Sequence, residues 1–564
     1  MEALSKSQKA RTAIATFKTL ADAIILRGSY SPSGKTGKKL EDALRNFSPE
    51  IYGSMSDPRI VELRGLEYVI DRLPRGIEKC NKIILTAQEE LNNTTFEEVH
   101  ALRRRRVSYI VSENEMCFVV TRGSTEIYDL LTHLTFLNIE AQKIHTQVFI
   151  AGGGTSPEWE ELKKTVKSEE ELGEAELDQA IWNLSIILGR TYKETRSTYL
   201  NLETNRKDNF NNGLFRIINS LGQRVINETA AANELLTIYF TPSLQEILGH
   251  HKYASVWAVN IKKRLLAEKL DKRPVHIVSA NLHSFLNIFY GKAAIEATGA
   301  KPPADLYEMV EEIRGSDISV PDYATKHGLI EQHDISGSGI EVQIIDSSKL
   351  TDACLHPEVT VNREYISTSK PVILIMDYAF GAQAYEIMDE LLSPCVIDGK
   401  RISLQVKSIS IMGKAGILPG KKGDIMLATA HVMEGTPHNY ILENDLCKED
   451  FVDKIDVYSG PMVTVLGTSL QNKDVLERFH SSSWRAIGLE MEGGHYQRAI
   501  NAAIIQGNIP KDLKVRYAYY ASDNPLLSGH TLASGPMGAD GVVPTYMVSK
   551  IIIQKIFESL DEQP

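Results

Sequence analysis

The sequence predicts an α/β protein in which a mainly helical N-terminal region precedes an α/β domain that begins near Asp271. Two observations lead to this fold class. Between residues 157 and 270, apolar residues recur at helical spacing, as at Ile181, Leu184 and Leu188. After residue 273, short β-branched runs alternate with helical stretches, a pattern typical of a domain with a mixed or parallel central sheet.

The C-terminal half shows the alternation most clearly. Its expected strands are residues 275–279, 341–345, 372–376, 405–412, 424–429, 462–467, 486–490 and 515–521. Helices are expected between several of them, at residues 382–392, 494–505 and 546–560. This half, residues 271–564, is predicted to be one domain.

The N-terminal half, residues 1–270, is expected to be helical with one or two strands. Helices are predicted at residues 60–71 and 96–106, and short strands at residues 118–121 and 147–151. The segment AGGGTSPEWE combines three glycines with a Ser-Pro-Glu helix start, so it predicts a subdivision near residues 151–157.

Composition limits the classes of function. The 564 residues are 43% hydrophobic and 24% charged, as in ordinary globular proteins, and the net charge of -11 argues against nucleic-acid and membrane-surface partners. The five cysteines are dispersed without metal-site spacing, so no metal and a reducing compartment are expected. Without a signal-peptide pattern or a long apolar run, we expect a cytoplasmic protein.

Three segments that could carry catalytic or binding residues follow one another in the C-terminal half. In SIMGKAGILPGKKGD, Gly413 and Gly416 would let the backbone approach a ligand at the carboxyl end of a strand, where α/β sheets place their sites. The alternative is that these glycines only shape a tight turn. That alternative stays open from this segment alone.

The second segment, GLEMEGGHYQRAI, is a strand that runs into a helix through two acidic residues. Strand alternation would place Glu490 and Glu492 on one side and Met491 on the other. A carboxylate there could accept hydrogen bonds from two neighbouring ribose hydroxyls. Taken alone, the pattern favours two solvated surface acids.

The third segment, YAYYASDNPLLSGH, is a hydrophobic strand that ends at Ser522 and Asp523. An acid directly after such a strand should lie at a cleft, where a raised pKa would let it protonate a leaving group. A helix-capping or turn aspartate is the alternative.

Together the three segments resemble the purine and uridine phosphorylase superfamily of nucleoside phosphorylases and nucleosidases, over about residues 271–559. The continuation SDNPLLSG is most similar to AMP nucleosidase. The resemblance implies a three-layer α/β domain with a mixed central sheet. The matching positions are the glycine-rich Gly413, Lys414, Ala415 and Gly416, then Gly423 and Asp424, the intact Glu490-Met491-Glu492, Ser522-Asp523, and Gly381 in an upstream turn.

The resemblance also implies a mechanism, cleavage of an N-glycosidic bond through a ribosyl cation-like transition state. Asp523 would protonate the departing purine, Glu492 would hold the ribose hydroxyls and Met491 would pack against the sugar. Base contacts would come from the segment that includes Thr468. No cofactor is implied, and family members are typically homo-oligomers. The extra N-terminal half suggests, by analogy with AMP nucleosidase alone, a regulatory or oligomerisation role.

Departures from the family pattern bear on the nucleophile. Where family phosphorylases carry a phosphate-binding arginine, this chain has Ile411 or Met412, which favours water. Lys414 could replace that charge or bind a nucleotide's 5′-phosphate, or be a solvated turn lysine. Hydrolytic members often carry a glutamate after the first strand, but here the loop is SANLHS, in which His283 is a candidate base or a simple helix-start residue.

Three hypotheses follow from these positions. The first is hydrolysis of a purine nucleoside or nucleotide. The second is phosphorolysis with inorganic phosphate, and the third is a nucleotide- or nucleoside-binding sensor with little or no turnover. Phosphate dependence separates the first two.

Overall fold

The computed structural model describes residues 4–558 except 92, 105, 151–153, 169–171, 232–233, 351–354, 452–454 and 529–536. The chain forms two compact units, each treated by itself below. The first comprises residues 1–250 and 469–475, and the second comprises residues 251–468 and 476–564. None of the described helices is long and apolar enough to cross a membrane.

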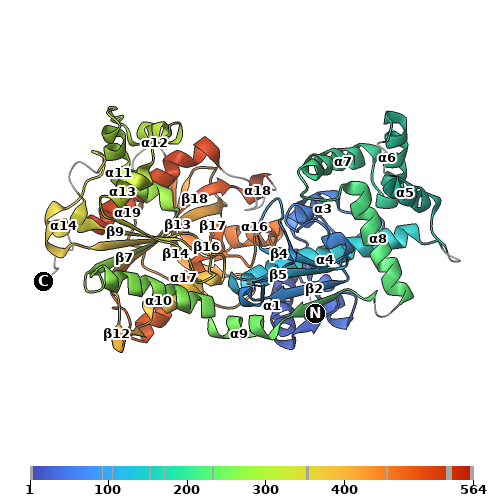
Figure 1. Ribbon diagram of the computed structural model, residues 1–564, viewed down its shortest axis with the longest axis horizontal. Helices are drawn as coiled ribbons and strands as arrows, with labels where there is room; N and C mark the ends of the chain where they lie inside the picture. Colours follow the sequence, from blue (N-terminus) through green and yellow to red (C-terminus); the bar gives the residue numbers. More distant parts are fainter. Residues whose placement is uncertain are drawn as a thin grey trace. The chain divides into compact units, whose positions relative to one another are not determined.

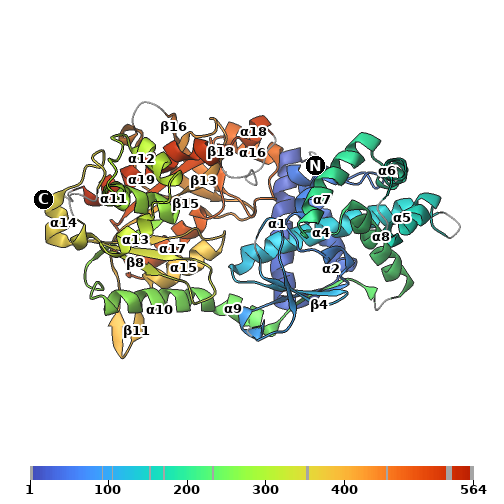
Figure 2. The ribbon, with the colours of Figure 1, turned by 45° about the horizontal axis from the view of Figure 1, so that its top comes forward.

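The first unit is mainly helical, as predicted, but it holds a six-stranded sheet (Figure 2) where the sequence suggested one or two strands, because its short strands pair with partners far along the chain. Its helices are α1 (Lys6–Arg27), α2 (Lys35–Phe47), α3 (Leu63–Ile70), α4 (Gly123–Val148), α5 (Pro157–Lys167), α6 (Glu174–Leu188), α7 (Tyr192–Lys207), α8 (Leu214–Ala230) and α9 (Pro242–His250). Its strands are β1 (Ser29–Tyr30), β2 (Lys82–Thr86), β3 (Glu97–Val99), β4 (Ser108–Ser112), β5 (Glu115–Val119) and β6 (Thr237–Phe240). The central α4 is buried on almost every side and packs against α2 and α8.

Two local predictions for this unit were wrong. The helix expected at residues 96–106 is instead strand β3 followed by a loop, because β3 pairs with β4, a neighbour that local helical spacing does not reveal. Of the strand expected at residues 147–151, the first two residues end α4, Phe149 makes an isolated bridge with Thr155, and residue 151 lies outside the described residues. The proposed subdivision near residues 151–157 falls partly outside the described residues, and α5 begins after Ser156.

A short segment from the C-terminal half of the sequence, residues 469–475, belongs to the first unit. Asn472 holds it there: its Nδ2 donates to the backbone oxygens of Phe47 at 2.8 Å and Ser48 at 3.3 Å. Its Oδ1 accepts a hydrogen bond from Val475 N at 3.0 Å. The main chain adds a bond from Glu50 N to Gln471 O at 3.0 Å.

The second unit is a three-layer α/β structure with a mixed central sheet, as predicted (Figure 1). Its strands are β7 (Pro274–Ser279), β8 (Leu329–Gln332), β9 (Val342–Asp346), β10 (Val372–Met376), β11 (Cys395–Ile397), β12 (Lys400–Ile402), β13 (Gln405–Ile417), β14 (Ile425–Met433), β15 (Asn439–Ile441), β16 (Val457–Thr464), β17 (Gly488–Glu490) and β18 (Lys514–Asp523). Its helices are α10 (Lys252–Ala267), α11 (Leu282–Ala297), α12 (Leu306–Arg314), α13 (Val320–Thr325), α14 (Arg363–Ser369), α15 (Gln383–Leu392), α16 (Lys473–Ser481, which begins within the first unit), α17 (Gly493–Ile505), α18 (Pro525–Ser528) and α19 (Val542–Phe557).

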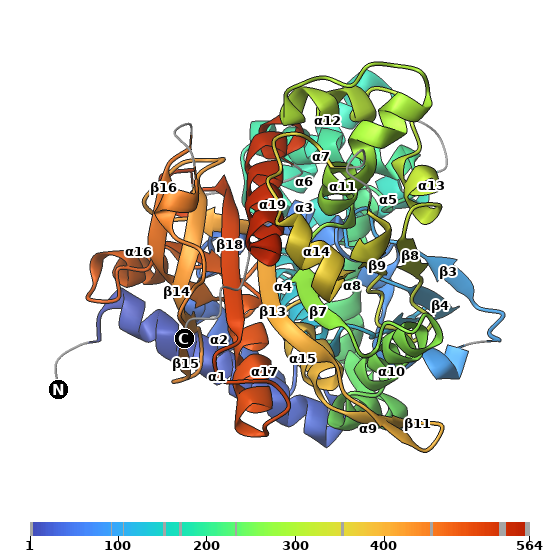
Figure 3. The same cartoon turned by 90° about the vertical axis from the view of Figure 1, so that its left-hand side faces the viewer.

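Both faces of this sheet are covered, because successive strand side chains point to opposite sides. In β10, Val372 and Leu374 pack in the core beneath α10, α15 and α17. Ile373 and Ile375 pack in the opposite core, beneath α11, α12, α13 and α19 (Figure 3). The second unit begins with α10, before the boundary expected at residue 271, because Trp257 and its apolar neighbours on α10 belong to the first of these cores.

One end of the sheet closes on itself. The pairings run from β13 to β18, β14, β16 and β17 and back to β13, a ring of five strands. Strand β13 therefore belongs both to the open sheet, through β7, and to the ring, through β17. This double membership positions the candidate site.

Candidate functional site

Three strand ends converge on the middle of β13. Along one edge of β13, the pairing with β7 ends at Ile411, opposite Ser279, and the pairing with β17 begins at Gly416, opposite Leu489. Because β7 is parallel and β17 antiparallel to β13, their carboxyl ends point toward each other across this interval. On the other edge, parallel β18 ends at Asp523, opposite Gly416. The carboxyl ends of strands, at a point where the strand order changes, are where α/β sheets form their binding crevices.

Glu490, the last residue of β17, is an internal anchor. Its side chain is 2% exposed, and Oε2 accepts hydrogen bonds from the backbone N–H of Glu492 at 2.6 Å and from that of Gly493. Its Oε1 accepts a hydrogen bond from the Thr464 hydroxyl and lies 3.3 Å from His431 Nδ1. Burial alone would raise the pKa of Glu490, but these hydrogen bonds outweigh it and hold the pKa below its usual range.

Glu492 has a different environment. Strand β17 ends at Glu490, so Glu492 is the N-cap residue of α17 and the prediction that both carboxylates share one side of a strand is wrong. The half-buried Glu492 accepts a hydrogen bond at Oε1 from the backbone N–H of Gly381, at 2.9 Å. Gly381 forms the turn after β10 with a φ of 56°, a left-handed conformation that favours glycine.

The end of β7 is tied to the same helix. The hydroxyls of Ser279, at the end of β7, and Tyr496, on α17, lie 2.9 Å apart. Together with the Gly381 contact, this fixes the start of α17 against the carboxyl ends of β7 and β10. Met491, between the two acids, is buried.

Ser522 and Asp523 end β18 in a fixed geometry. The Ser522 hydroxyl lies 2.5 Å from Asp523 Oδ1 and 3.2 Å from the Ala415 carbonyl of β13, and it can donate to one of them at a time. Asp523 is 8% exposed. Asn524 secures the chain that follows, because its Nδ2 donates to the carbonyls of Leu418 at 2.9 Å and Gly420 at 2.8 Å.

A cavity of about 450 Å³ opens beside Lys414 of β13. Its walls come from α11, α12, β13, β18, the segment before α19, and α19 itself. Three of its lining residues carry basic side chains, Lys414, His283 and Arg314. Its described lining includes neither Asp523 nor Glu492.

The polar groups of this cavity are partly preorganised. Asn287 Nδ2 donates to the Tyr546 hydroxyl at 2.8 Å, which holds both side chains in place. Loss of hydration and, second, the positive charge of Arg314 lower the pKa of His283. The imidazole is therefore mainly neutral at pH 7. The basic side chains of Lys414 and Arg314 suit an anionic ligand.

The glycine-rich segment differs from the prediction. Gly413, Lys414 and Gly416 were expected after the end of a strand at residues 405–412 but lie inside β13, because β18 pairs along the whole segment. A Cβ added to Gly413 would meet Tyr378 Cε1 at 3.6 Å, an ordinary contact, so packing alone does not demand glycine there.

One predicted site residue does not line the cavity, and one lining residue was not predicted. Thr468 lies in a turn after β16 and is not among the described residues that line the cavity. Arg314 was not among the predicted site residues, because it lies in a helical stretch far from the three segments and no local pattern marks it as a ligand-binding residue. No group of three or more His, Cys, Asp or Glu side chains among the described residues could hold a metal ion.

A model named Family of unknown function (DUF6909) matches residues 38–299 and 307–558. The chain belongs to this family. No curated protein matches the chain.

The solved structures similar to the chain include several nucleosidases and phosphorylases. The 5′-methylthioadenosine/S-adenosyl homocysteine nucleosidase of Campylobacter jejuni is 10% identical, with 51% of this chain and 100% of that chain covered and a TM-score of 0.30. Native futalosine hydrolase of Helicobacter pylori is 13% identical, covering 51% and 99%, at 0.29. Uridine phosphorylase isoform 2 of Schistosoma mansoni is 13% identical, covering 53% and 92%, at 0.29.

Proposed function

We propose that the second unit hydrolyses the N-glycosidic bond of a purine nucleoside or nucleotide, in the manner of AMP nucleosidase. The observation that carries the proposal is that the three motif-bearing segments meet in one place, because β13 carries the first, and β17 and β18, which carry the other two, end beside its Gly416. Their order and residue types resemble those of nucleoside-cleaving enzymes, and they are far apart in sequence.

Asp523 is the acid of this proposal. Cleavage leaves negative charge on the departing base, so a proton delivered to the purine makes it a better leaving group, an effect of about 10²–10⁴-fold in rate. Asp523 suits the role because it is buried at a strand end and its Oδ1 is held by Ser522 at 2.5 Å. A fixed carboxyl needs no reorganisation when the bond breaks.

Glu492 is the ribose-binding group, and Glu490 positions it. The oxygens of Glu490 are occupied inside the protein, whereas Glu492 is half-buried, follows the end of β17 and accepts a hydrogen bond from Gly381 N. Its carboxylate could accept hydrogen bonds from two neighbouring hydroxyls while stabilising positive charge on the sugar. Met491 would pack against the sugar.

The cationic cavity favours a phosphate group in the reaction. Lys414 and Arg314 line it together, with neutral His283 beside them. These groups suit the 5′-phosphate of a nucleotide substrate. They suit inorganic phosphate equally, so phosphorolysis is the second candidate, favoured by this one observation. His283 could act as base toward water in the first case.

The deciding experiment measures release of free base from AMP, adenosine, inosine and methylthioadenosine, with and without inorganic phosphate. Asp523→Asn is the test variant. Asp512→Asn is its matched control, the same exchange at an exposed turn before the other end of β18. Release without phosphate that is lost in Asp523→Asn and kept in Asp512→Asn is expected.

Other outcomes would replace this proposal. Release only with phosphate would establish the phosphorylase. Tight nucleotide binding without release of any base would favour a sensor that keeps the pocket but not turnover. Equal activity of both variants would remove Asp523 from the mechanism.

The remaining parts of the proposal concern assembly and location. We propose that the first unit serves regulation or homo-oligomer formation and that the protein acts in the cytoplasm. Sedimentation of the full chain and of a chain lacking residues 1–250 tests the oligomeric part.

A further inference from the structure

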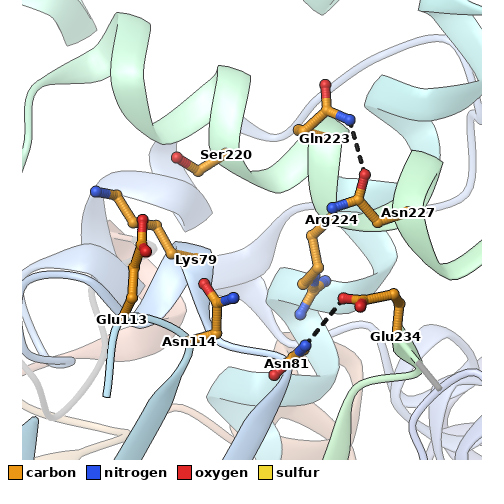
Figure 4. A pocket seen from close by; sticks show the side chains of 9 residues that line it. All are labelled: Lys79, Asn81, Glu113, Asn114, Ser220, Gln223, Arg224, Asn227 and Glu234. Carbon is orange, nitrogen blue, oxygen red and sulfur yellow. Dashed lines mark hydrogen bonds between the residues drawn. The ribbon is translucent and has the colours of Figure 1, made fainter.

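A polar pocket of the first unit lies at the amino ends of three strands, β2, β5 and β6 (Figure 4). Its volume is about 180 Å³. Its walls come from the segments that lead into these strands and from one face of α8. Main-chain bonds fix its floor: Asn81 N donates to Asn114 O at 3.0 Å, and Thr237 N donates to Asn81 O at 2.9 Å.

Arg224 of α8 lies against this pocket and is only 7% exposed. Its Nη2 donates to Asn138 Oδ1 at 3.2 Å, while its buried Nε has no hydrogen-bond partner. The carboxylate that attracts it most, Glu228, is itself engaged by the Ser33 hydroxyl at 2.8 Å and Leu236 N at 3.0 Å. Burial lowers the pKa of Arg224.

A buried guanidinium with an unused donor costs folding free energy, because the water it loses is not replaced by a partner. A ligand that supplies the missing acceptor would offset this cost. A carboxylate is the natural match, since its two oxygens fit the planar donors of arginine.

The other charged side chains of the pocket limit the chemical class of its ligand. Lys79 at the rim adds a second cation, but Glu113 and Glu234 add two acids. The Glu234 carboxylate accepts a hydrogen bond from Asn81 Nδ2 at 3.1 Å, and Figure 4 shows it turned toward Arg224. The two acids next to the cations would repel a polyanion such as phosphate. A molecule that carries one positive and one negative group would instead match the acidic and the basic side chains together.

We propose that this pocket binds a small zwitterion of the free amino-acid class, with its carboxylate on Arg224 and its ammonium group on Glu234. The pocket is small beside the roughly 300–1,000 Å³ of sites for larger ligands, which fits a ligand of this size. The amide side chains of Asn81, Asn114 and Asn227 supply donors and acceptors for the remainder. This assignment does not depend on the activity of the second unit.

Calorimetric titration of the full chain with each L-amino acid of the genetic code tests the proposal, with acetate and inorganic phosphate as comparators. Arg224→Gln and Glu234→Gln are the test variants. Arg216→Gln is the matched control, because Arg216 lies on the same helix but lines a different pocket.

Saturable binding of at least one amino acid is expected, weakened roughly thirtyfold or more in Arg224→Gln and unchanged in Arg216→Gln. Glu234→Gln should weaken amino-acid binding about tenfold or more without weakening acetate. If Arg224→Gln does not fold by circular dichroism, Glu234→Gln alone decides. Failure of every amino acid to bind overturns the proposal, as does binding of phosphate alone or binding indifferent to both test variants.

Discussion

Replacing Glu490 and Glu492 separately by glutamine should separate a structural carboxylate from a ligand-binding one. Glu490 is buried and accepts hydrogen bonds from two backbone N–H groups at the start of α17, in addition to the Thr464 hydroxyl. Glu492 accepts a hydrogen bond from Gly381 N and is half-buried. Both substitutions keep the side-chain shape and remove the charge.

The magnitudes follow from these contacts. A hydrogen bond to a charged group contributes about 1.5–3 kcal/mol and a neutral one about 0.5–1.5, so each backbone N–H bond to Glu490 loses about 1 kcal/mol in the amide. Loss of a negative charge at a helix N-terminus adds about 0.3–1 kcal/mol. Glu490→Gln should therefore lower the free energy of unfolding by about 2–3 kcal/mol, and Glu492→Gln by about 1 kcal/mol or less.

Urea unfolding followed by circular dichroism measures both values. The pH dependence gives a second check, because the folded-state pKa of Glu490 is lowered. Its contribution to stability is complete above the unfolded pKa, near 4.3, and is lost as the pH falls through the folded value. The stability curves of wild type and Glu490→Gln should converge in acid. Equal destabilisation by the two variants, or a constant difference at every pH, would refute the anchoring role of Glu490.

Three further predictions follow from other contacts. Lys414→Met should raise KM for AMP by about tenfold or more and leave KM for adenosine nearly unchanged, because it removes a charged partner of the phosphate; equal effects on both substrates would place the phosphate elsewhere. If His283 is the base, activity should be lost in acid with a midpoint below about pH 6.5, because the pKa of His283 is lowered, and His283→Gln should remove this acid limb of the pH profile. An acid limb that persists in the variant would exclude this role. Asn472→Ala should destabilise the first unit by about 1–3 kcal/mol, because the buried carbonyl of Phe47 loses its donor, which calorimetric unfolding would detect; an unchanged transition would contradict the anchoring role of residues 469–475.

The sequence determined most of the elements of the second unit. Residues 372–376 were predicted as a strand and form β10, and the strands at residues 275–279 and 515–521 match β7 and β18 within a few residues. Buried parallel strands are continuous apolar runs, so composition alone reveals them. The strand predicted at residues 462–467 begins earlier, as β16, because Pro461 is accommodated where the pairing of β14 shifts register between Ala428 and Ala430.

The three segments and their order were also predicted from the sequence, but the role of each side chain was not. Local spacing could not tell Glu490 from Glu492, because their difference depends on where β17 ends and on contacts with His431 and Gly381. It placed Lys414 in a turn, because glycine propensity is local while pairing with β18 is not.

Only the tertiary structure brought Arg314 to Lys414 and left the guanidinium of Arg224 beside a pocket. Arg314 and Lys414 are about 100 residues apart in the sequence, and the environment of Arg224 depends on its burial. Packing between such distant segments sets the environment of a side chain. The chain thus encodes its elements locally, whereas the direction and charge environment of each functional group arise when distant strands and helices meet.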